Sequence, residues 1–204
     1  MQKTEAIVFD LGGVILDIDY NLTRTAFEEL GVHNFDEMYS QSSADMLFSN
    51  LETGKISEEN FFIEINKCTG LQLSPAEIKQ AWCAMLLNFR EKSLLFLDEL
   101  KPKYKLFLLS NTNHIHIPEF NKIYNTKKRE RPFAAYFEKD YYSCEIGLRK
   151  PDAVCYDWVL QKEKLVPAKT IFVDDSAQNV EAAKLAGMQT ILLEPGKYIE
   201  DLDL

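Results

Sequence analysis

Four short stretches, far apart in the chain, each carry residues suited to bind phosphate or a metal. They are Ala6–Asp10, Leu106–Ser110, Arg149–Pro151 and Ile171–Asp175. Three of them are hydrophobic runs typical of buried strands, and each run ends in a polar residue. The carboxyl ends of neighbouring strands in an open α/β sheet form one crevice, so residues distant in sequence can meet there. The ordered set therefore predicts a single site that combines carboxylates, a hydroxyl and an amine.

Strand-like and helix-like segments alternate along most of the chain. Apolar, β-branched runs predict strands, and amphipathic segments between them predict helices. The expected strands cover residues 4–10, 104–109, 141–144, 170–173 and 189–193, and the expected helices 94–100, 151–164 and 176–187. Repeated strand–helix units indicate an α/β protein with a doubly wound, parallel, Rossmann-like sheet.

A block of about 70 residues interrupts this pattern. Residues from about 21 to 90 contain no comparable strand but several helix starts, at Asn21, Ser57 and Ser74. Ser74 opens a capping box with proline at the first helical position. The block is too long for a simple crossover. We therefore expect an α/β core formed by residues 1–16 and 92–204, with a small helical cap inserted over 17–91. A second irregular stretch is expected from Asn113 to about Phe137.

Composition narrows the classes of partner. The 204 residues include 23 Lys and Arg against 32 Asp and Glu, a net charge of −9. Such an acidic chain is a poor candidate for binding nucleic acid by neutralising phosphates. No signal peptide precedes the first strand and no apolar run approaches a membrane span. The four cysteines show no paired spacing, which is typical of reduced thiols. We expect a cytoplasmic monomer or homodimer that binds a small molecule, with no membrane or nucleic-acid partner.

Asp10 and Ser110 are candidates for direct contact with phosphate. Asp10 comes just before Gly12-Gly13, where the backbone can turn tightly and approach a ligand. An aspartate so placed can attack phosphorus and form an aspartyl-phosphate, although a turn aspartate is the simpler interpretation of this residue alone. Ser110 and Asn111 can donate hydrogen bonds to phosphate oxygens, although these residue types also favour helix caps.

Lys150 and the acidic pair complete the candidate site. The Lys150 ammonium can neutralise both an attacking carboxylate and a phosphate, although a lone surface lysine is the usual alternative. The adjacent carboxylates of Asp174 and Asp175 repel each other unless a cation or partner offsets their charge. Hard oxygen ligands favour Mg²⁺.

Together these segments resemble the four motifs of the haloacid dehalogenase superfamily. Residues 9–14 are similar to its first motif, 109–113 to its second, 147–152 to its third, and 172–176 with Asn179 to its fourth. The resemblance spans residues 5 to about 193, with the helical insert where the family's small cap occurs. The start of the chain and Leu109–Asn113 most resemble the branch containing α-D-glucose-1-phosphate phosphatases and the phosphatase domain of soluble epoxide hydrolase.

The resemblance implies a role for each candidate residue. Asp10 would be the nucleophile and a Mg²⁺ ligand, and the Gly12 carbonyl would also bind the metal. Ser110 and Asn111 would bind phosphate, and Lys150 would neutralise the charges of the nucleophile and the phosphate. Asp175 aligns with the usual metal aspartate, and Asp174 would be a second ligand or its partner. The implied enzyme is a magnesium-dependent phosphatase that hydrolyses a small phosphorylated metabolite through an aspartyl-phosphate.

One position departs from the family pattern. Most phosphatases of the superfamily carry an aspartate two residues after the nucleophile, as general acid and base, and this chain has Gly12. General acid–base catalysis typically contributes ~10²–10⁴-fold, so a good leaving group is needed or another acid substitutes. The anomeric hydroxyl of a sugar 1-phosphate is such a leaving group. Asp17 and Asp19 are possible substitutes, but solvated or capping roles at the cap hinge are expected for them.

Other functions compete with this interpretation. A haloacid dehalogenase would use the nucleophile without magnesium, which the acidic pair argues against. A phosphomutase relies more heavily on the missing acid, and a response-regulator receiver has its acidic pair before the phosphorylated aspartate. A catalytically weak phosphate-binding protein stays open because of Gly12. His114 and His116 follow the phosphate loop, and we expect them to be loop histidines.

Overall fold

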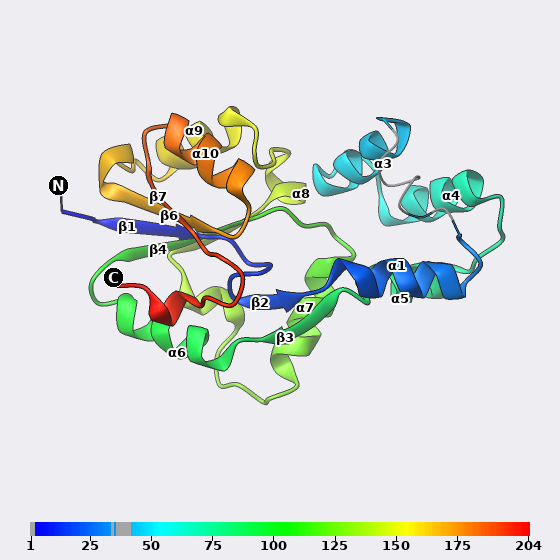
Figure 1. Ribbon diagram of the computed structural model, residues 1–204, viewed down its shortest axis with the longest axis horizontal. Coiled ribbons are helices and arrows are strands. Elements are labelled where there is room, and N and C mark those ends of the chain that lie inside the picture. The colour runs from blue at the N-terminus through cyan, green and yellow to red at the C-terminus, as the bar shows by residue number, and fades with distance from the viewer. Residues whose placement is uncertain (1–2, 34, 36–41) are drawn as a thin grey trace.

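The computed structural model describes residues 3–33, 35 and 42–204 (Figure 1). Parts of the expected core (residues 1–2) and of the expected cap (residues 34 and 36–41) lie outside the described residues. No helix of the described part is long and apolar enough to cross a membrane.

A five-stranded parallel sheet forms the centre of the molecule. Its strands, in spatial order, are β5 (Lys139–Tyr142), β4 (Lys105–Ser110), β1 (Ala6–Phe9), β6 (Thr170–Asp174) and β7 (Gln189–Leu192). In the central register, Phe9 lies opposite Leu108 on one side and Val173 on the other. This register brings the carboxyl ends of β1, β4 and β6 to one edge. The predicted α/β fold with a parallel sheet is confirmed.

Helices cover both faces of this sheet (Figure 1). The helices of one face are α6 (Glu91–Leu100) and α7 (His116–Asn125), and those of the other are α9 (Ala153–Lys162) and α10 (Ala177–Leu185). Successive side chains of a strand point to opposite faces. Ile7 and Phe9 accordingly pack with α6 and α7, whereas Ala6 and Val8 pack with α9 and α10. Strands buried on both faces explain why the sequence runs are continuously apolar.

Further helical segments form a second hydrophobic cluster beside the sheet. They are α1 (Tyr20–Glu29), α3 (Ser42–Glu52), α4 (Glu58–Thr69) and α5 (Pro75–Cys83). Phe27, Phe61 and Trp82 are buried in this cluster. The predicted starts at Ser57 and Ser74 are confirmed, and Ser74 forms the expected capping box with Glu77. The predicted Asn21 cap is wrong, because the Asp19 side chain accepts the hydrogen bond that caps α1.

A two-stranded antiparallel ribbon connects this helical cluster to the sheet. It consists of β2 (Leu16–Ile18) and β3 (Leu86–Phe89), with Leu16 opposite Phe89. The prediction that residues 21–90 contain no strand is therefore wrong at β3. The ribbon pairs segments about 70 residues apart, and local periodicity carries no signal of such a partner.

The stretch predicted as irregular between residues 113 and 137 contains α7 and a short 3₁₀ helix, η1 (Phe133–Tyr136). The side-chain oxygen of Asn113 accepts hydrogen bonds from the backbone N–H groups of Ile115 and His116, which satisfies the first turn of α7. Asn113 thus takes the capping role that its residue type favours. The remaining short helices are α8 (Ser143–Ile146), η2 (Pro167–Lys169) and η3 (Ile199–Asp201).

Candidate active site

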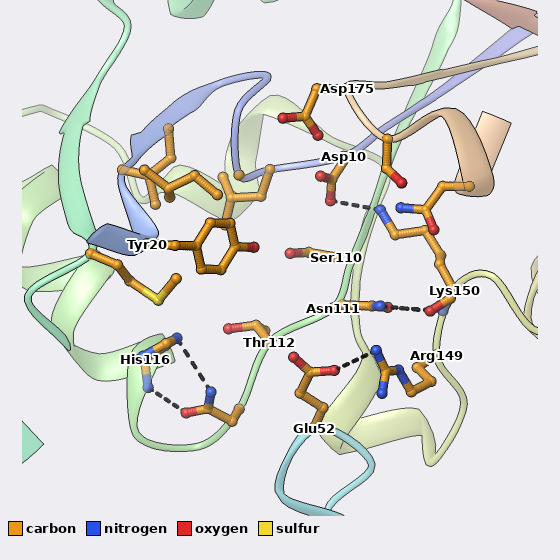
Figure 2. Close-up of a pocket in the computed structure, with 18 of the residues that line it drawn as sticks. Asp10, Tyr20, Glu52, Ser110, Asn111, Thr112, His116, Arg149, Lys150 and Asp175 are labelled. Atoms are coloured by element: carbon orange, nitrogen blue, oxygen red, sulfur yellow. Dashed lines mark hydrogen bonds and ion pairs between the residues drawn. The ribbon is translucent and has the colours of Figure 1, made fainter. Parts of the chain in front are cut away.

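A cavity of about 440 Å³ lies over the carboxyl ends of β1, β4 and β6, and Figure 2 shows its lining. The candidate residues Asp10, Gly12, Ser110, Asn111, Lys150 and Asp175 all line it. Asp174 is fully buried directly behind Lys150. The tertiary structure therefore brings together every residue that the sequence nominated for the site.

Lys150 lies at the centre of the charges. Its Nζ is 2.7 Å from Oδ1 of Asp10 and 2.6 Å from Oδ2 of Asp174, and the side chain is only 1% exposed. Burial acts to lower the pKa of Lys150, but the two carboxylates outweigh it and raise the pKa above its usual value. A buried ammonium is tolerated only when opposite charges pair with it. The helix expected from residue 151 begins only at Ala153, as α9.

Asp10 is buried beside this lysine. Burial raises the pKa of Asp10 to about 7. The charge of Asp174 adds to this rise, and the charge of Lys150 acts against it. Its backbone N–H donates to the carbonyl of Val173 at 2.9 Å, which fixes the residue at the end of β1. A carboxylate held rigidly at a cavity wall is suited to act as a nucleophile.

Asp174 and Asp175 are adjacent in sequence but differ in surroundings. The Asp174 carboxylate accepts hydrogen bonds from Ser176 N–H, Asn179 Nδ2 and Lys150 Nζ, at 2.6 to 3.1 Å. Asp175 is exposed, and among the described residues no other side chain donates a hydrogen bond to it. Burial and the neighbouring charge of Asp174 raise the pKa of Asp175. Asp175 therefore has carboxylate lone pairs that are free for a ligand, whereas those of Asp174 are occupied.

The donor set fits a hard divalent cation. Carboxylate oxygens of Asp10, Asp174 and Asp175 lie within 4.8 Å of one another, and Lys150 offsets only part of their charge. Gly13 gives Asp175 room to approach, since a Cβ at this position would lie 1.9 Å from Oδ2 of Asp175. Its φ of +73° also favours glycine. A cluster of oxygen ligands with unbalanced negative charge is typical of a magnesium site.

Asn111 fixes the backbone of Lys150. Its Nδ2 donates to the Lys150 carbonyl at 2.8 Å, and its Oδ1 accepts from the Lys150 N–H at 2.9 Å. The side chain therefore positions the catalytic lysine candidate as well as lining the cavity. The hydroxyl of Ser110 also faces the cavity (Figure 2). Ser110 is the one residue of β4 with a side-chain hydroxyl, and this hydroxyl can donate to a phosphate oxygen.

Neither substitute for the missing acid at Gly12 lines the cavity. Asp17 forms an ion pair with Arg90 at 2.6 Å, and Asp19 caps α1. The capping role expected for Asp19 is confirmed. Tyr20, the next residue, points its ring into the cavity (Figure 2).

Several further residues line the cavity, contributed by the helical cluster and by neighbouring loops, and none of them was predicted as a site residue. They are Tyr20, Glu52, Trp82, Met85, His116 and Arg149. His116 was expected in a loop, but it is buried at the start of α7 and stacks on Trp82. Arg149 directly precedes Lys150 in the third motif, so its place in the sequence could have predicted that it lies at the site. Glu52 ends α3 in the insert, and nothing in the local sequence distinguishes it from a solvated helix residue.

Comparison with known proteins agrees with this geometry. A family model described as haloacid dehalogenase-like hydrolase matches residues 4–187. The chain is 32% identical over 195 residues to a D-ribitol-5-phosphate phosphatase of Bacteroides thetaiotaomicron, covering 93% of this chain and 92% of that protein. It is 26% identical over 198 residues to a phosphorylated carbohydrates phosphatase of Thermotoga maritima, covering 92% and 83%. A 51-residue match, 39% identical, links it to bifunctional epoxide hydrolase 2 of Rattus norvegicus, covering 25% of this chain and 9% of that protein.

Solved structures are similar over the whole chain. The wild-type HAD family enzyme bt-2542 from Bacteroides thetaiotaomicron, in complex with magnesium and inorganic phosphate, has a TM-score of 0.87 and 29% identity, covering 98% of this chain and 100% of that one. An L-2-haloacid dehalogenase from Xanthobacter autotrophicus has a TM-score of 0.61 and 18% identity, covering 93% and 77%, which shows a shared fold only. The site geometry and these matches lead to one conclusion: the chain belongs to the haloacid dehalogenase-like hydrolase family.

Proposed function

We propose that this hydrolase is a magnesium-dependent phosphatase that hydrolyses a small phosphorylated metabolite through an aspartyl-phosphate on Asp10. The observation that carries the proposal is the buried Lys150 ammonium, held between Asp10 and Asp174 beside the exposed Asp175. One lysine among three carboxylates leaves negative charge for a metal to balance, and the cavity in front of them leaves room for a phosphate ester.

The relatives support the same reaction class. One is named for a polyol phosphate and another for phosphorylated carbohydrates. The similar structure of bt-2542 contains magnesium and inorganic phosphate. Magnesium is the cofactor of the proposed reaction, and inorganic phosphate is its product. The proposal carries this chemistry over to the present chain.

In the proposed reaction Asp10 attacks phosphorus in line with the ester bond. A new Asp10–phosphorus bond forms, the phosphorus–oxygen ester bond breaks, and the leaving alcohol takes up a proton. Lys150 and Ser110 hold the phosphoryl oxygens while charge develops on them. Water then cleaves the aspartyl-phosphate, which releases inorganic phosphate and restores the carboxylate. Magnesium, when bound by Asp10, Asp175 and the Gly12 carbonyl, supplies further positive charge at the phosphoryl group.

Two substrate types are candidates. The lack of an acid at Gly12 favours a sugar 1-phosphate, whose anomeric oxygen leaves without full protonation. The name of the Bacteroides relative favours a polyol phosphate, whose leaving group is an ordinary alcohol. Both are polyhydroxylated monophosphates whose carbon chain carries no charge, and this shared class is the substrate we propose.

The decisive experiment is Asp10→Asn, assayed for phosphate release from a panel of phosphate esters with Mg²⁺ present. We expect turnover to fall at least about 10³-fold, because an amide cannot form the covalent intermediate. Thermal unfolding of the variant provides the control that the fold is retained. Turnover above a few per cent of wild type would rule out covalent catalysis by Asp10.

The same panel, extended by a haloacid, separates the two rival functions. An inert phosphate-binding protein releases no phosphate from any ester, with or without Mg²⁺. A dehalogenase keeps its activity on haloacids after chelation with EDTA, whereas the phosphatase proposed here loses its activity on phosphate esters. The exposed carboxylate of Asp175, free for a ligand in the described structure, favours the metal-dependent function.

A further inference from the structure

Three of the cavity-lining residues carry buried polar atoms that have no protein hydrogen-bond partner. Within the described part of the chain, four buried side-chain N or O atoms lack one, and they belong to Glu52, Trp82, Arg129 and Arg149. All but Arg129 line the cavity over the candidate catalytic residues. Buried polar groups in native proteins are nearly always hydrogen-bonded, so a cluster of exceptions in one cavity needs an explanation.

Glu52 and Arg149 face each other across the cavity wall. Nη2 of Arg149 lies 3.1 Å from Oε2 of Glu52, as the dashed line in Figure 2 marks. The contact pairs the charges, but Oε2 of Glu52 and Nε of Arg149 both stay without a hydrogen bond within the described chain. Those two atoms are themselves buried, but the side chains of Glu52 and Arg149 are 20% and 33% exposed and line the cavity, so the pair presents a carboxylate acceptor and guanidinium donors to a ligand. Two neighbouring hydroxyl groups of a sugar or polyol match that pattern, since each can both donate and accept.

The pair is placed where the body of a phosphorylated substrate must lie. Arg149 directly precedes Lys150, which is the residue that we assign to the phosphoryl group. Glu52 reaches the cavity from the C-terminal end of α3, on the same side as Thr112 in the loop that follows β4 (Figure 2). A molecule whose phosphate contacts Lys150 thus extends its carbon chain along Glu52 and Arg149.

Glu52 also restricts the charge that a substrate can carry. Burial raises the pKa of Glu52, while Arg149 and then Lys150 act to lower it. Arg149 already balances the Glu52 carboxylate, so a second carboxylate on the substrate brings uncompensated negative charge into the cavity. A like charge placed there opposes binding, which is a usual source of specificity.

We propose that Glu52 and Arg149 form a hydroxyl-binding subsite that selects polyhydroxylated monophosphates with no charge beyond the phosphate group and rejects phosphates that also bear a carboxylate. This inference rests on the proposed phosphatase function and deepens it by naming the residues that choose the substrate. Glu52 accepts a hydrogen bond from one hydroxyl group of the substrate, and Arg149 donates one to the oxygen of an adjacent hydroxyl group.

The test uses two matched substrates, a ribitol phosphate and the ribonate phosphate that differs from it only by a carboxylate at the far end. For Glu52→Gln we expect kcat/KM on the ribitol phosphate to fall about tenfold, since a hydrogen bond to a charged group is lost. On the ribonate phosphate we expect it to rise about fivefold, since the repelling charge is gone. A loss of folded protein would lower kcat/KM on both substrates, so it cannot produce changes of opposite sign.

Two further variants serve as controls. Glu59→Gln removes the same charge from an exposed position on α4, and we expect kcat/KM on both substrates to stay as in wild type. Glu52→Asp keeps the charge but withdraws the oxygens, so it lowers the rate on the ribitol phosphate without raising the rate on the ribonate phosphate.

The outcomes separate this inference from the proposed function. If the wild-type protein hydrolyses neither these substrates nor an aryl phosphate, both the phosphatase function and the hydroxyl-binding subsite are ruled out. A wild type that hydrolyses them, with Glu52→Gln changing both rates by the same factor or not at all, overturns the hydroxyl-binding subsite alone.

Discussion

Gly12 is the residue that most distinguishes this site from that of a typical phosphatase of its family. It lies two positions after Asp10 and provides no acid for the leaving group, and Asp17 and Asp19 are engaged with Arg90 and with α1. A Cβ at Gly12 would meet only the flexible end of Ile18, at 3.0 Å. An aspartate can therefore be introduced at this position with little displacement of the backbone.

We expect the rate of phosphate release to depend steeply on the acidity of the leaving group. Aryl phosphates and sugar 1-phosphates should react faster than alkyl phosphates that bind equally well, because a poor alkoxide needs a proton in the transition state. Gly12→Asp should flatten this dependence by raising the rate on alkyl phosphates. The measurement is log kcat against leaving-group pKa for both proteins. A flat plot for the wild type would point to another acid in the cavity, with the Tyr20 hydroxyl as the first to test (Figure 2).

The two adjacent aspartates allow a second prediction at this scale. Asp175→Ala should raise the Mg²⁺ concentration needed for half-maximal activity by about tenfold or more, because it removes a free carboxylate ligand. Asp174→Ala should act mainly by lowering kcat, since Asp174 accepts from Lys150, Ser176 and Asn179 rather than facing the cavity. Titration of activity against Mg²⁺ for the two variants compares them directly. Equal shifts in the Mg²⁺ requirement would contradict the assignment of Asp175 as the direct ligand.

At the scale of elements, the contact between α5 and α7 joins the helical cluster to the sheet. Nε2 of His116 on α7 lies 3.0 Å from the carbonyl oxygen of Trp82 on α5, and the two rings stack at 5.2 Å. Donation to a carbonyl requires a proton on Nε2, so Nδ1 is left to accept from Asn113 at 3.3 Å. Both ring nitrogens are thereby satisfied by the neutral imidazole. Burial lowers the pKa of His116 to about 4.

This contact predicts a pH-dependent stability. Above pH 6.5 His116 is neutral in both states, but as the pH falls from 6.5 toward 4 only the unfolded chain takes up its proton. The free energy of unfolding should therefore fall by up to about 3 kcal/mol over this interval because of His116. His116→Gln keeps a donor for the Trp82 carbonyl and should remove this part of the slope. Denaturant unfolding at several pH values measures it, and the exposed His33→Gln serves as the control for replacing a histidine by glutamine.

At the scale of the whole molecule, the end of α3 packs closely against the sheet-side helix α8. Gly54 has φ of +67°, and a Cβ at this position would lie 2.2 Å from the carbonyl oxygen of Cys144 on α8. This approach fixes the end of α3, and with it the Glu52 side chain, over the cavity. The helical segments and the α/β sheet thus share one active site (Figures 1 and 2).

Gly54→Ala should push α3 away from α8 and lower kcat/KM for a polyol phosphate by about tenfold or more, because small displacements of positioning groups are costly. Gly70→Ala is the matched control, since Gly70 has nearly the same φ of +70° but nothing within 4 Å of its Cβ position. Both variants should lose about 1–2 kcal/mol of stability from left-handed strain, but only Gly54→Ala should impair catalysis. Equal kinetics in the two variants would show that the contact of α3 with α8 does not position the site.

The sequence by itself determined the parallel α/β sheet and the residues at its carboxyl edge. Continuous apolar runs such as 171–173 report strands buried on both faces, and the polar residues that end them, Asp10 and Ser110, must lie at one edge of a parallel sheet. Ser57 and Ser74 were readable as helix starts because capping depends on neighbours within one turn.

Only the tertiary structure decided the features that join distant segments. The pairing of β2 with β3, the stack of His116 on Trp82 and the meeting of Glu52 with Arg149 each connect residues dozens of positions apart. Their free energy comes from burial and geometry that exist only after the chain has folded, so no local pattern encodes them. The sequence therefore nominates the candidate reacting groups, and the packing of the helical segments over the sheet decides which other side chains lie beside them.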